Sequence, residues 1–361
     1  MSGIKGKVKF INADGSEFFA VLRSRVENYF SQNGISKNAN AAMVFKTIFM
    51  LTLFFVPYLL MLSNLFTPWI DVALFLFMGI GVSGIGLSVM HDANHGSYSA
   101  SPAINSFLSY TMELVGGSGY NWRIKHNILH HTYTNINGMD DDLNAGIIVR
   151  FSPEQKKLKL HRYQHIYSWF LYGMLTLLWV TASDFMGLIK YTRRGLNKGG
   201  LPIPVQFLKL FALKVVYFGY IFALPLLLTD IAWWQLLIGF VGMHFIAGLI
   251  LSSIFLCAHI VEEADYPVPD VDGTIKNEWA IHQLFTTANF ARANKFLTWF
   301  IGGLNYQVEH HLFPKVCHVH YPKLSLIVQQ TAREFKLPYH AYPTFTSALI
   351  SHHRVLKRLG R

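Results

Sequence analysis

Three short histidine-rich stretches carry the residues of this 361-residue chain with the clearest chemical meaning. They are HDANH at 91–95, HNILHH at 126–131 and QVEHH at 307–311. Residues four apart on a helix lie on one face, about 5–6 Å from each other. His91 and His95, like His126 and His130, can therefore direct two imidazoles at one place. One such pair would mean little, but three stretches of this kind predict a shared metal site.

The number and type of these ligands limit which metals they can bind. Neutral imidazole suits zinc, copper, iron and nickel. A closed structural zinc site needs four ligands, and the three stretches hold seven histidines, so two metal ions are predicted. The zinc-protease motif HExxH is absent from the sequence, which leaves that chemistry without its general base.

The composition indicates that apolar helices position these histidines. Hydrophobic residues make up 52% of the chain and charged residues 14%, which is too little charge for a soluble surface. The same values exclude a disordered chain, and the two cysteines, Cys257 and Cys317, exclude a disulfide scaffold. A lipid bilayer is the predicted partner. Segments long enough to cross it lie at 43–63, 69–90, 166–190, 208–229 and 232–257.

The net charge of +11 is a second property that fits a membrane protein. Nucleic acid is one class of partner for so basic a chain. Lys and Arg also collect on the cytoplasmic side of membrane proteins and fix their topology. We therefore expect a lipid bilayer and no nucleic acid.

If all three histidine stretches share one side of the membrane, an even number of crossings must separate residues 91 and 307. We expect segment 166–190, with Asp184 inside it and basic residues on both flanks, to lie in the membrane plane or to be re-entrant. The four remaining segments then form two hairpins, with both termini and all histidine stretches cytoplasmic. Lys214, inside a span, is expected to reach the cytoplasmic interface by extending its side chain.

The expected domain organisation follows from these spans. Residues 1–40 form a cytoplasmic lead-in with a short helix around Phe18–Phe30, residues 41–325 form the membrane domain, and residues 326–361 form a basic cytoplasmic tail. The GxGxxG pattern at Gly79, Gly81 and Gly84 lies inside an apolar segment. It is therefore interpreted as helix packing and not as a dinucleotide site.

The stretches HDANH, HNILHHTYTN and QVEHHLFP resemble the three histidine boxes of the membrane fatty-acid desaturases. The resemblance covers residues 40–325, and order, spacing and position relative to the spans all agree. It implies an all-α integral membrane fold, with four transmembrane helices under a cytoplasmic helical cap that holds two iron ions. It also implies removal of two hydrogens from an acyl chain by dioxygen and two delivered electrons, which leaves a cis double bond.

The resemblance also implies the metal ligands. Gln307 occupies a position where many relatives have histidine, which resembles the subgroup that desaturates between an existing double bond and the carboxyl end. The amide is expected either to ligate through oxygen or to act beside the ligands. The family has one further isolated ligand, for which His259 is preferred to His282. The implied ligands are His91, His95, His126, His130, His131, His310, His311 and His259, with Gln307 as a further candidate and His282 as the alternative to His259.

Acidic and basic residues beside the boxes have two interpretations each. In one interpretation, the carboxylates orient ligand imidazoles through the ring nitrogen that does not bind metal. In the other, they belong to solvated turns. This group comprises Asp92, Asp140, Asp141, Asp142 and Glu309. Arg123 and Lys125 precede the second box and either contact a substrate head group or belong to a positive cytoplasmic surface.

No flavin, nicotinamide or haem motif remains once the glycine pattern is discounted, and HPGG is absent. A separate electron donor is therefore expected, either ferredoxin or cytochrome b5 with its reductase. The alternatives to a desaturase of acyl-CoA or acyl-lipid are a hydroxylase or ketolase on the same scaffold, and a membrane metal transporter or sensor. The location is a bacterial inner membrane or the endoplasmic reticulum.

Overall fold

The computed structural model describes residues 8–197 and 201–361, and the chain divides into two compact units. Unit 1 takes in the chain up to Ala39, Lys125–Ser168 and Ser253–Arg361. Unit 2 takes in Asn40–Ile124 and Trp169–Ser252. Each unit is thus assembled from stretches that are distant in sequence, and three helices continue from one unit into the other.

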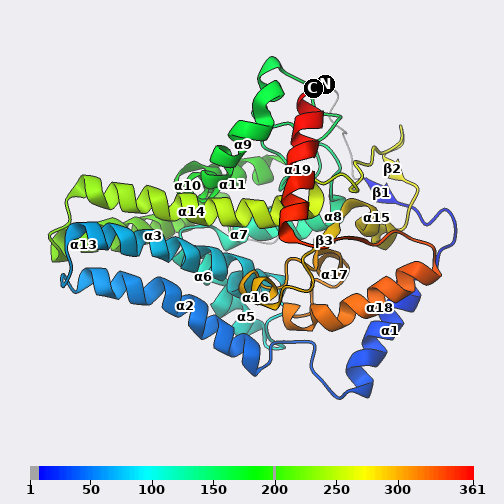
Figure 1. The fold of residues 1–361 in the computed structure, drawn as a ribbon, viewed down its shortest axis with the longest axis horizontal. Helices are drawn as coiled ribbons and strands as arrows, with labels where there is room; N and C mark the ends of the chain where they lie inside the picture. Colours follow the sequence, from blue (N-terminus) through cyan, green and yellow to red (C-terminus); the bar gives the residue numbers. More distant parts are fainter. Residues whose placement is uncertain (1–7, 198–200) are drawn as a thin grey trace. The chain divides into compact units, whose positions relative to one another are not determined.

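The regular elements among the described residues of unit 2 are all helices (Figure 1). They are α2 (Ala41–Leu62), α3 (Pro68–Gly84), η1 (Ile85–Val89), α4 (Met90–His95), α5 (Pro102–Ser109), α6 (Thr111–Leu114), α7 (Gly119–Trp122), α9 (Gln164–Gly173), α10 (Leu175–Leu178), η4 (Trp179–Ser183), α11 (Asp184–Arg193), α12 (Ile203–Phe218), η5 (Gly219–Ala223), α13 (Leu224–Leu228) and α14 (Trp233–His259). Three π-helical segments, η1, η4 and η5, join neighbouring α-helices, and α9 and α14 continue into unit 1.

Four helical segments in the described part of the chain are long and apolar enough to cross a membrane. They are Ala41–Leu62, Pro68–His95, Ile203–Leu228 and Trp233–His259, and each contains or closely matches one predicted span. The fifth apolar stretch forms two helices, Lys159–Gly173 and Leu175–Arg193, bent by 56°. This geometry is that of a broken span or a re-entrant loop. Whether the stretch crosses a membrane stays a prediction.

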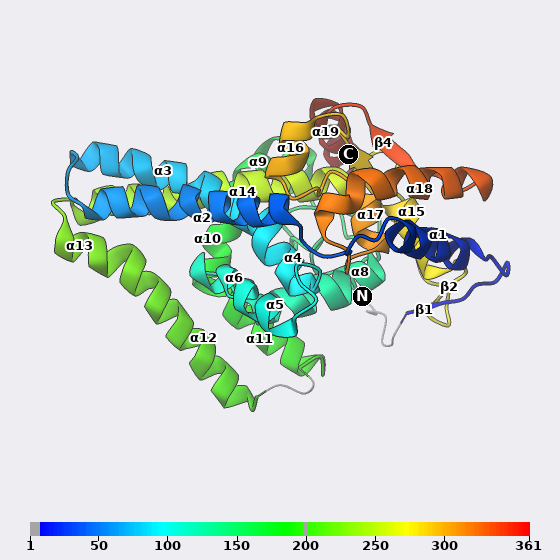
Figure 2. The same ribbon diagram turned by 90° about the horizontal axis from the view of Figure 1, so that it is seen from below.

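The two helical hairpins of unit 2 are joined at their turns. The first turn separates α2 from α3, and the second separates α13 from α14. Asn64 donates from its side-chain amide to Asp230 Oδ2 at 3.1 Å, and the Asp230 backbone N–H donates to Asn64 Oδ1 at 3.1 Å. Since α3 and α14 both start at these joined turns, both run away from the same end of the unit (Figure 2).

The glycines of the GxGxxG pattern allow close helix packing, as predicted. A Cβ atom on Gly79 would lie 2.5 Å from the Met243 carbonyl oxygen of α14. A Cβ atom on Gly81 would lie 2.8 Å from the Leu53 backbone of α2. These distances are shorter than a van der Waals contact, so a side chain at either position would push a neighbouring helix away.

Lys214 does not extend to an interface, which corrects the prediction. Its side chain is buried, and its ammonium lies 2.6 Å from Asp184 Oδ2. The ammonium also donates to the backbone carbonyls of Gly116 and Trp179, at 2.5 and 3.0 Å. A buried charge needs such partners, and the acidic residue of the bent helix pair provides the counter-charge.

Unit 1 is mostly helical and contains two pairs of very short parallel strands. Its elements are β1 (Lys9–Phe10), α1 (Phe18–Gln32), η2 (Arg123–His130), α8 (His131–Tyr133), η3 (Lys159–Tyr163), β2 (Thr274–Ile275), α15 (Trp279–Thr286), β3 (Ala288–Phe290), α16 (Lys295–Phe300), α17 (Gln307–Leu312), η6 (His318–His320), α18 (Tyr321–Glu334), β4 (His340–Tyr342) and α19 (Phe345–Gly360). Strand β1 pairs with β2 and β3 pairs with β4. The predicted short helix around 18–30 is α1.

The core of unit 1 holds the third histidine stretch in place. Helix α1 packs along α18 (Figures 1 and 2), and α15 and α17 pack against them. Val308 and Leu312, four residues apart on α17, are buried in this core with Leu22 and Leu324. Burial of each such side chain stabilises the fold by about 1.5–3 kcal/mol. The core therefore fixes the orientation of α17 and with it the direction in which the opposite face of the helix points.

Candidate metal centre

Six of the predicted ligands lie together in unit 1, and none is more than 5% exposed. They come from four elements: the π-helix η2, α8, the end of α14 and α17. Ligand atoms of two groups of three lie within 4.8 Å of one another, and His311 belongs to both groups. The groups are His130, His259 and His311, and His131, His310 and His311.

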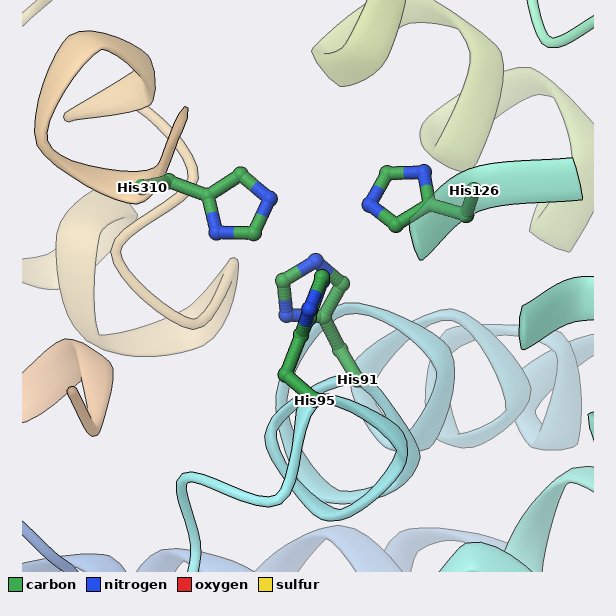
Figure 3. Close-up of side chains that lie close together, drawn as sticks. All are labelled: His91, His95, His126 and His310. Atoms are coloured by element: carbon green, nitrogen blue, oxygen red, sulfur yellow. The ribbon is translucent and has the colours of Figure 1, made fainter. Parts of the chain in front are cut away.

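The imidazole nitrogens of these residues approach each other closely. His131 Nε2 lies 2.9 Å from His310 Nε2 and 3.3 Å from His126 Nε2. The rings of His126 and His310 come from different elements and are nearly parallel, with 5.8 Å between their centroids and 17° between their planes; they approach each other across a small gap (Figure 3). The Nε2 atoms of His126, His131 and His310 thus crowd into one small region.

The opposite nitrogen, Nδ1, is held by a hydrogen bond in five of the six rings. A carbonyl or carboxylate oxygen can only accept, so in four of these rings Nδ1 carries the proton and Nε2 keeps its lone pair. The bonds run from His126 to Asp142 (2.7 Å), from His130 to Asp140 (2.9 Å), from His311 to the side-chain oxygen of Gln283 (2.8 Å), from His259 to the Thr286 carbonyl (3.2 Å), and between His310 and the Tyr321 hydroxyl (3.3 Å).

A tight turn brings Asp140 to His130. Asn135 has a left-handed conformation with φ of 60°, which Asn tolerates better than most residues. Its backbone N–H donates to Asp140 Oδ2 at 3.1 Å, and its side-chain amide donates to the carbonyl of His259 at 3.0 Å. The turn therefore connects the second histidine stretch to the isolated histidine at the end of α14.

Glu309 fixes the helix that carries His310 and His311. Its carboxylate accepts hydrogen bonds from the Asn289 amide at 2.9 Å and from the Tyr339 hydroxyl at 2.8 Å. The Asn289 side chain also accepts from the backbone N–H of Val308 at 2.9 Å. Burial raises the pKa of Glu309 to about 7. Glu309 therefore anchors α17, and its hydrogen bonds go to Asn289 and Tyr339.

The acidic run after the second box is not a solvated turn, because Asp140 is buried and Asp142 is half-buried. Lys125 lies 2.9 Å from Asp142. Burial opposes ionisation of Asp142, but Lys125 and His126 outweigh it and hold the pKa of Asp142 well below its usual value. Asp141 is also buried. Lys125 was a candidate to contact the substrate head group. It is instead paired with Asp142, whose carboxylate accepts a hydrogen bond from His126.

The structure distinguishes the two positions considered for the isolated ligand. The ring of His259 lies 4.7 Å from that of His130 and 4.9 Å from that of His311, between centroids. His282 instead donates from Nε2 to the Thr134 carbonyl at 2.9 Å. Burial lowers the pKa of His282 to about 4. Gln307 lies on the side of His259, with its amide nitrogen 3.1 Å from His259 Nε2.

His91 and His95 lie in unit 2, on the last turn of the helix that continues from α3. Their ring centroids are 4.7 Å apart (Figure 3), and both rings contact Trp122. Asp92 is buried, with Oδ1 3.6 Å from His91 Nδ1. Gly96, with φ of 71°, ends the helix directly after His95. The i, i+4 pairing predicted for this stretch is confirmed.

Sequence reasoning missed three residues that hold the imidazoles of predicted ligands or their backbone. Gln283 accepts from His311, Tyr321 contacts His310, and Thr134 donates to the His130 carbonyl at 2.8 Å. Thr134 lies four residues after His130, so helical spacing was a usable signal. Gln283 and Tyr321 have no comparable signal, because their positions depend on the packing of α15 and α18.

The six histidines of unit 1 fit a metal centre on the chemistry of their donor atoms. His130 Nε2 is buried and has no hydrogen-bond partner among the described residues. An unpaired buried acceptor costs about 1–3 kcal/mol, and lone pairs on facing Nε2 atoms repel. A cation among them would remove both costs. Held Nδ1 atoms and converging Nε2 atoms are the arrangement that metal-binding histidines adopt.

Comparison with known proteins gives concordant matches. The model of the family "Fatty acid desaturase" matches residues 67–343. The chain is 38% identical to an sn-1 linoleoyl-lipid 6-desaturase of Synechocystis sp., over 98% of each chain. It is 34% identical to an sn-1 linoleoyl-lipid 6-desaturase of Arthrospira platensis, over 100% of this chain and 96% of the relative. It is 36% identical to an acyl-lipid (8-3)-desaturase of Physcomitrium patens, over 99% of this chain and 74% of the relative.

Proposed function

Because the chain belongs to the fatty acid desaturase family and is an oxidoreductase that introduces a double bond into an acyl chain, we propose the metals, the substrate class and the membrane arrangement with which it does so. The family is metal-dependent and uses dioxygen. The proposed metal is a pair of iron ions.

The observation that carries this proposal is the convergence of six imidazoles in unit 1, with Nδ1 held by a hydrogen bond in five of them. Imidazole suits iron, and two overlapping groups of three histidines suit two ions. His91 and His95 complete the proposed ligand set, because they form the first histidine box and lie on one face of a helix. When bound, the iron pair supplies the redox chemistry with dioxygen that an unactivated methylene requires.

This chain's own residues supply orientation and basicity. Asp140 and Asp142 hold His130 and His126 in the tautomer that presents Nε2, and the negative charge of these carboxylates makes the imidazoles better ligands. Gln307 is proposed to bind beside His259, or to a metal through its amide oxygen. In the reaction, two hydrogens leave the acyl chain, two electrons arrive from a donor and two protons from solvent, and dioxygen is reduced to two waters.

The proposed substrate is an acyl chain esterified to a lipid, with the cis double bond formed near the carboxyl end. The names of the cyanobacterial relatives, sn-1 linoleoyl-lipid 6-desaturases, support this proposal, as does the name of the acyl-lipid (8-3)-desaturase. Gln307 at the start of the third box supports it independently, because this substitution resembles the carboxyl-proximal subgroup.

The proposed membrane arrangement has four spans in two hairpins and a cytoplasmic metal centre. Two features support it. The hydrogen-bonded turns at Asn64 and Asp230 put both hairpin turns on one side, and the spans Pro68–His95 and Trp233–His259 both end at a predicted ligand. Exposed apolar side chains along α2 and α12, such as Phe45 and Phe211, suit contact with lipid. A reporter fused after Arg194 is expected to be cytoplasmic.

The proposed electron donor is a separate ferredoxin or cytochrome b5 that docks on a basic cytoplasmic face. The net charge of +11 supports attraction of an acidic protein at this face. Purified enzyme with substrate and dioxygen is expected to form product only after a donor and its reductase are added. Turnover without a donor would contradict this part of the proposal.

The test of the function is expression in a host whose lipids lack carboxyl-proximal double bonds. Mass spectrometry with double-bond location, applied to intact lipids, should find a new cis double bond in lipid-linked chains. Gain of one oxygen in place of loss of two hydrogens would indicate a hydroxylase. Products found only in the acyl-CoA pool would contradict the lipid-linked substrate.

A further inference from the structure

Unit 2 contains a cavity of about 810 Å³ that the metal chemistry does not explain. It lies among α4, α5, α6, α7, α11 and α12, and His95 is one of its lining residues. Leucines of α11 and α12, including Leu188 and Leu210, line it together with amides and hydroxyls. A wall that mixes apolar and polar groups beside a proposed iron ligand suits the junction between an acyl chain and its head group.

Several polar groups of this wall already have partners, and these include both cations. Arg123 donates to Asn94 Oδ1 at 2.7 Å. Lys209 lies 3.1 Å from the Tyr110 hydroxyl and 5.3 Å from the centroid of the same ring. The wall also contains the carboxyl group of Glu113. A phosphate would meet this carboxylate and would compete for cations that the protein already engages.

Three oxygen acceptors on lining residues have no hydrogen-bond partner among the described residues: Glu113 Oε2, Asn121 Oδ1 and Gln206 Oε1. Asn121 donates from its amide to the Asp184 carbonyl at 2.6 Å. Gln206 donates to Asn197 Oδ1 at 2.9 Å and to the Leu201 carbonyl at 2.5 Å. These bonds fix the amide orientations, so the atoms without partners are oxygens.

Unpaired buried acceptors are costly, at about 1–3 kcal/mol each, and a ligand that brings donors removes this cost. Burial raises the pKa of Glu113, so its carboxylate is poorly solvated and would be stabilised by a donor. Hydroxyl groups are donors without charge. Phosphate diesters carry only acceptors, and choline carries no N–H or O–H donor.

We propose that this cavity binds the uncharged, hydroxyl-bearing head group of the substrate lipid, through donation to Glu113, Asn121 and Gln206. This inference rests on the proposed lipid-linked substrate and narrows it to neutral lipids. The hydroxyls can belong to a sugar or to the glycerol of a diacylglycerol. A double bond near the carboxyl end requires the ester linkage to lie close to the metals, which agrees with His95 lining the same cavity.

Lipid binding tests the inference without turnover. Purified protein is mixed with equal amounts of a monoglycosyl diacylglycerol, a diacylglycerol and a phosphatidylcholine that carry the same acyl chains, and retained lipid is measured by native mass spectrometry. We expect the hydroxyl-bearing lipids to be retained about tenfold over phosphatidylcholine, equivalent to about 1.4 kcal/mol. Comparison of the retention of the glycosyl lipid with that of the diacylglycerol shows whether the hydroxyls belong to a sugar or to glycerol. Equal retention of phosphatidylcholine would overturn the inference.

Substitutions connect the preference to the named oxygens. Gln206→Leu removes an acceptor and should reduce the preference severalfold. Gln235→Leu is the matched control, because Gln235 is equally buried in the same unit but does not line the cavity. An unchanged preference in Gln206→Leu, with Asn121→Leu also unchanged, would count against the assignment.

Turnover of the same lipids separates this inference from the proposed function. If acyl-CoA is desaturated and none of the three lipids is, the lipid-linked substrate is wrong. If all three lipids are desaturated at equal rates, the substrate class stands and the head-group assignment alone is wrong.

Discussion

His131 Nε2 and His310 Nε2 lie 2.9 Å apart, although 179 residues separate them in sequence. Two imidazole nitrogens reach this distance only when a proton or a cation lies between them, because their lone pairs otherwise repel. His131 Nε2 is also 3.3 Å from His126 Nε2, and one proton cannot serve all three atoms. The pair therefore indicates where a metal would bind within unit 1.

Replacement of His310 by alanine is expected to remove most of the bound iron and all desaturase activity, while the protein still inserts into membranes. The reason is that His310 supplies one of the crowded Nε2 atoms. Iron per chain is measured by elemental analysis and product by mass spectrometry of lipids. His353→Ala is the control, since His353 lies on α19 and belongs to neither group of converging histidines. Full iron content in His310→Ala would remove His310 from the ligand set.

Asp140→Asn should weaken metal binding while the fold is retained. Asp140 Oδ2 accepts from His130 Nδ1, and Oδ1 accepts from the backbone N–H of Asp142. The amide keeps the size of the carboxylate but loses its charge, and changes of this kind cost roughly 10–100-fold in metal affinity. Iron retention under increasing chelator concentration measures the effect. Asp272→Asn, at an exposed position, should behave as wild type.

His259→Ala and His282→Ala are expected to differ in the property that they change. His259→Ala should lower the iron content, because the ring lies with His130 and His311. His282→Ala should keep its iron but lose stability by about 1–3 kcal/mol, because the Thr134 carbonyl loses a buried donor. Iron analysis and thermal unfolding in detergent distinguish these outcomes. The opposite pattern would exchange the roles of the two histidines.

Gln307→Leu tests whether the amide beside His259 takes part in the centre. Its nitrogen lies 3.1 Å from His259 Nε2, so loss of the amide should decrease activity more than it decreases membrane insertion. Gln307→His should preserve iron, because imidazole can ligate from the same face. Activity of Gln307→Leu equal to wild type would show that the amide is dispensable.

Local patterns in the sequence predicted the apolar helices and the i, i+4 pairs. The predicted span 69–90 lies within the helix Pro68–His95, and hydropathy alone was sufficient there because the helix is apolar on most of its faces. The end of that helix after His95 also has a local signal in the sequence. It is the glycine at position 96, which adopts the left-handed conformation that ends the helix.

The supporting residues of the centre could not be predicted, because they depend on packing between distant segments. Gln283 reaches His311 only after α15 and α17 share one core. The strands β3 and β4 are three residues each and pair across about fifty residues, so neither alternation nor length identifies them. Asn289 of β3 accepts a hydrogen bond from the backbone N–H of Val308 at the start of α17. This contact could not be predicted for the same reason.

Lys214 and Asp184 form a buried ion pair in unit 2 with an N···O distance of 2.6 Å. Lys214→Met leaves the Asp184 charge without its cation, and breaking a buried pair in this way costs about 3–5 kcal/mol. The substitution should lower the unfolding temperature of the purified protein in detergent.

Lys214→Met combined with Asp184→Leu removes both charges, so it should recover most of the lost stability. Since neither residue lies among the converging histidines, the double variant should retain iron. A double variant as unstable as Lys214→Met would mean that the hydrogen bonds to Gly116 and Trp179, and not the ion pair, stabilise this region.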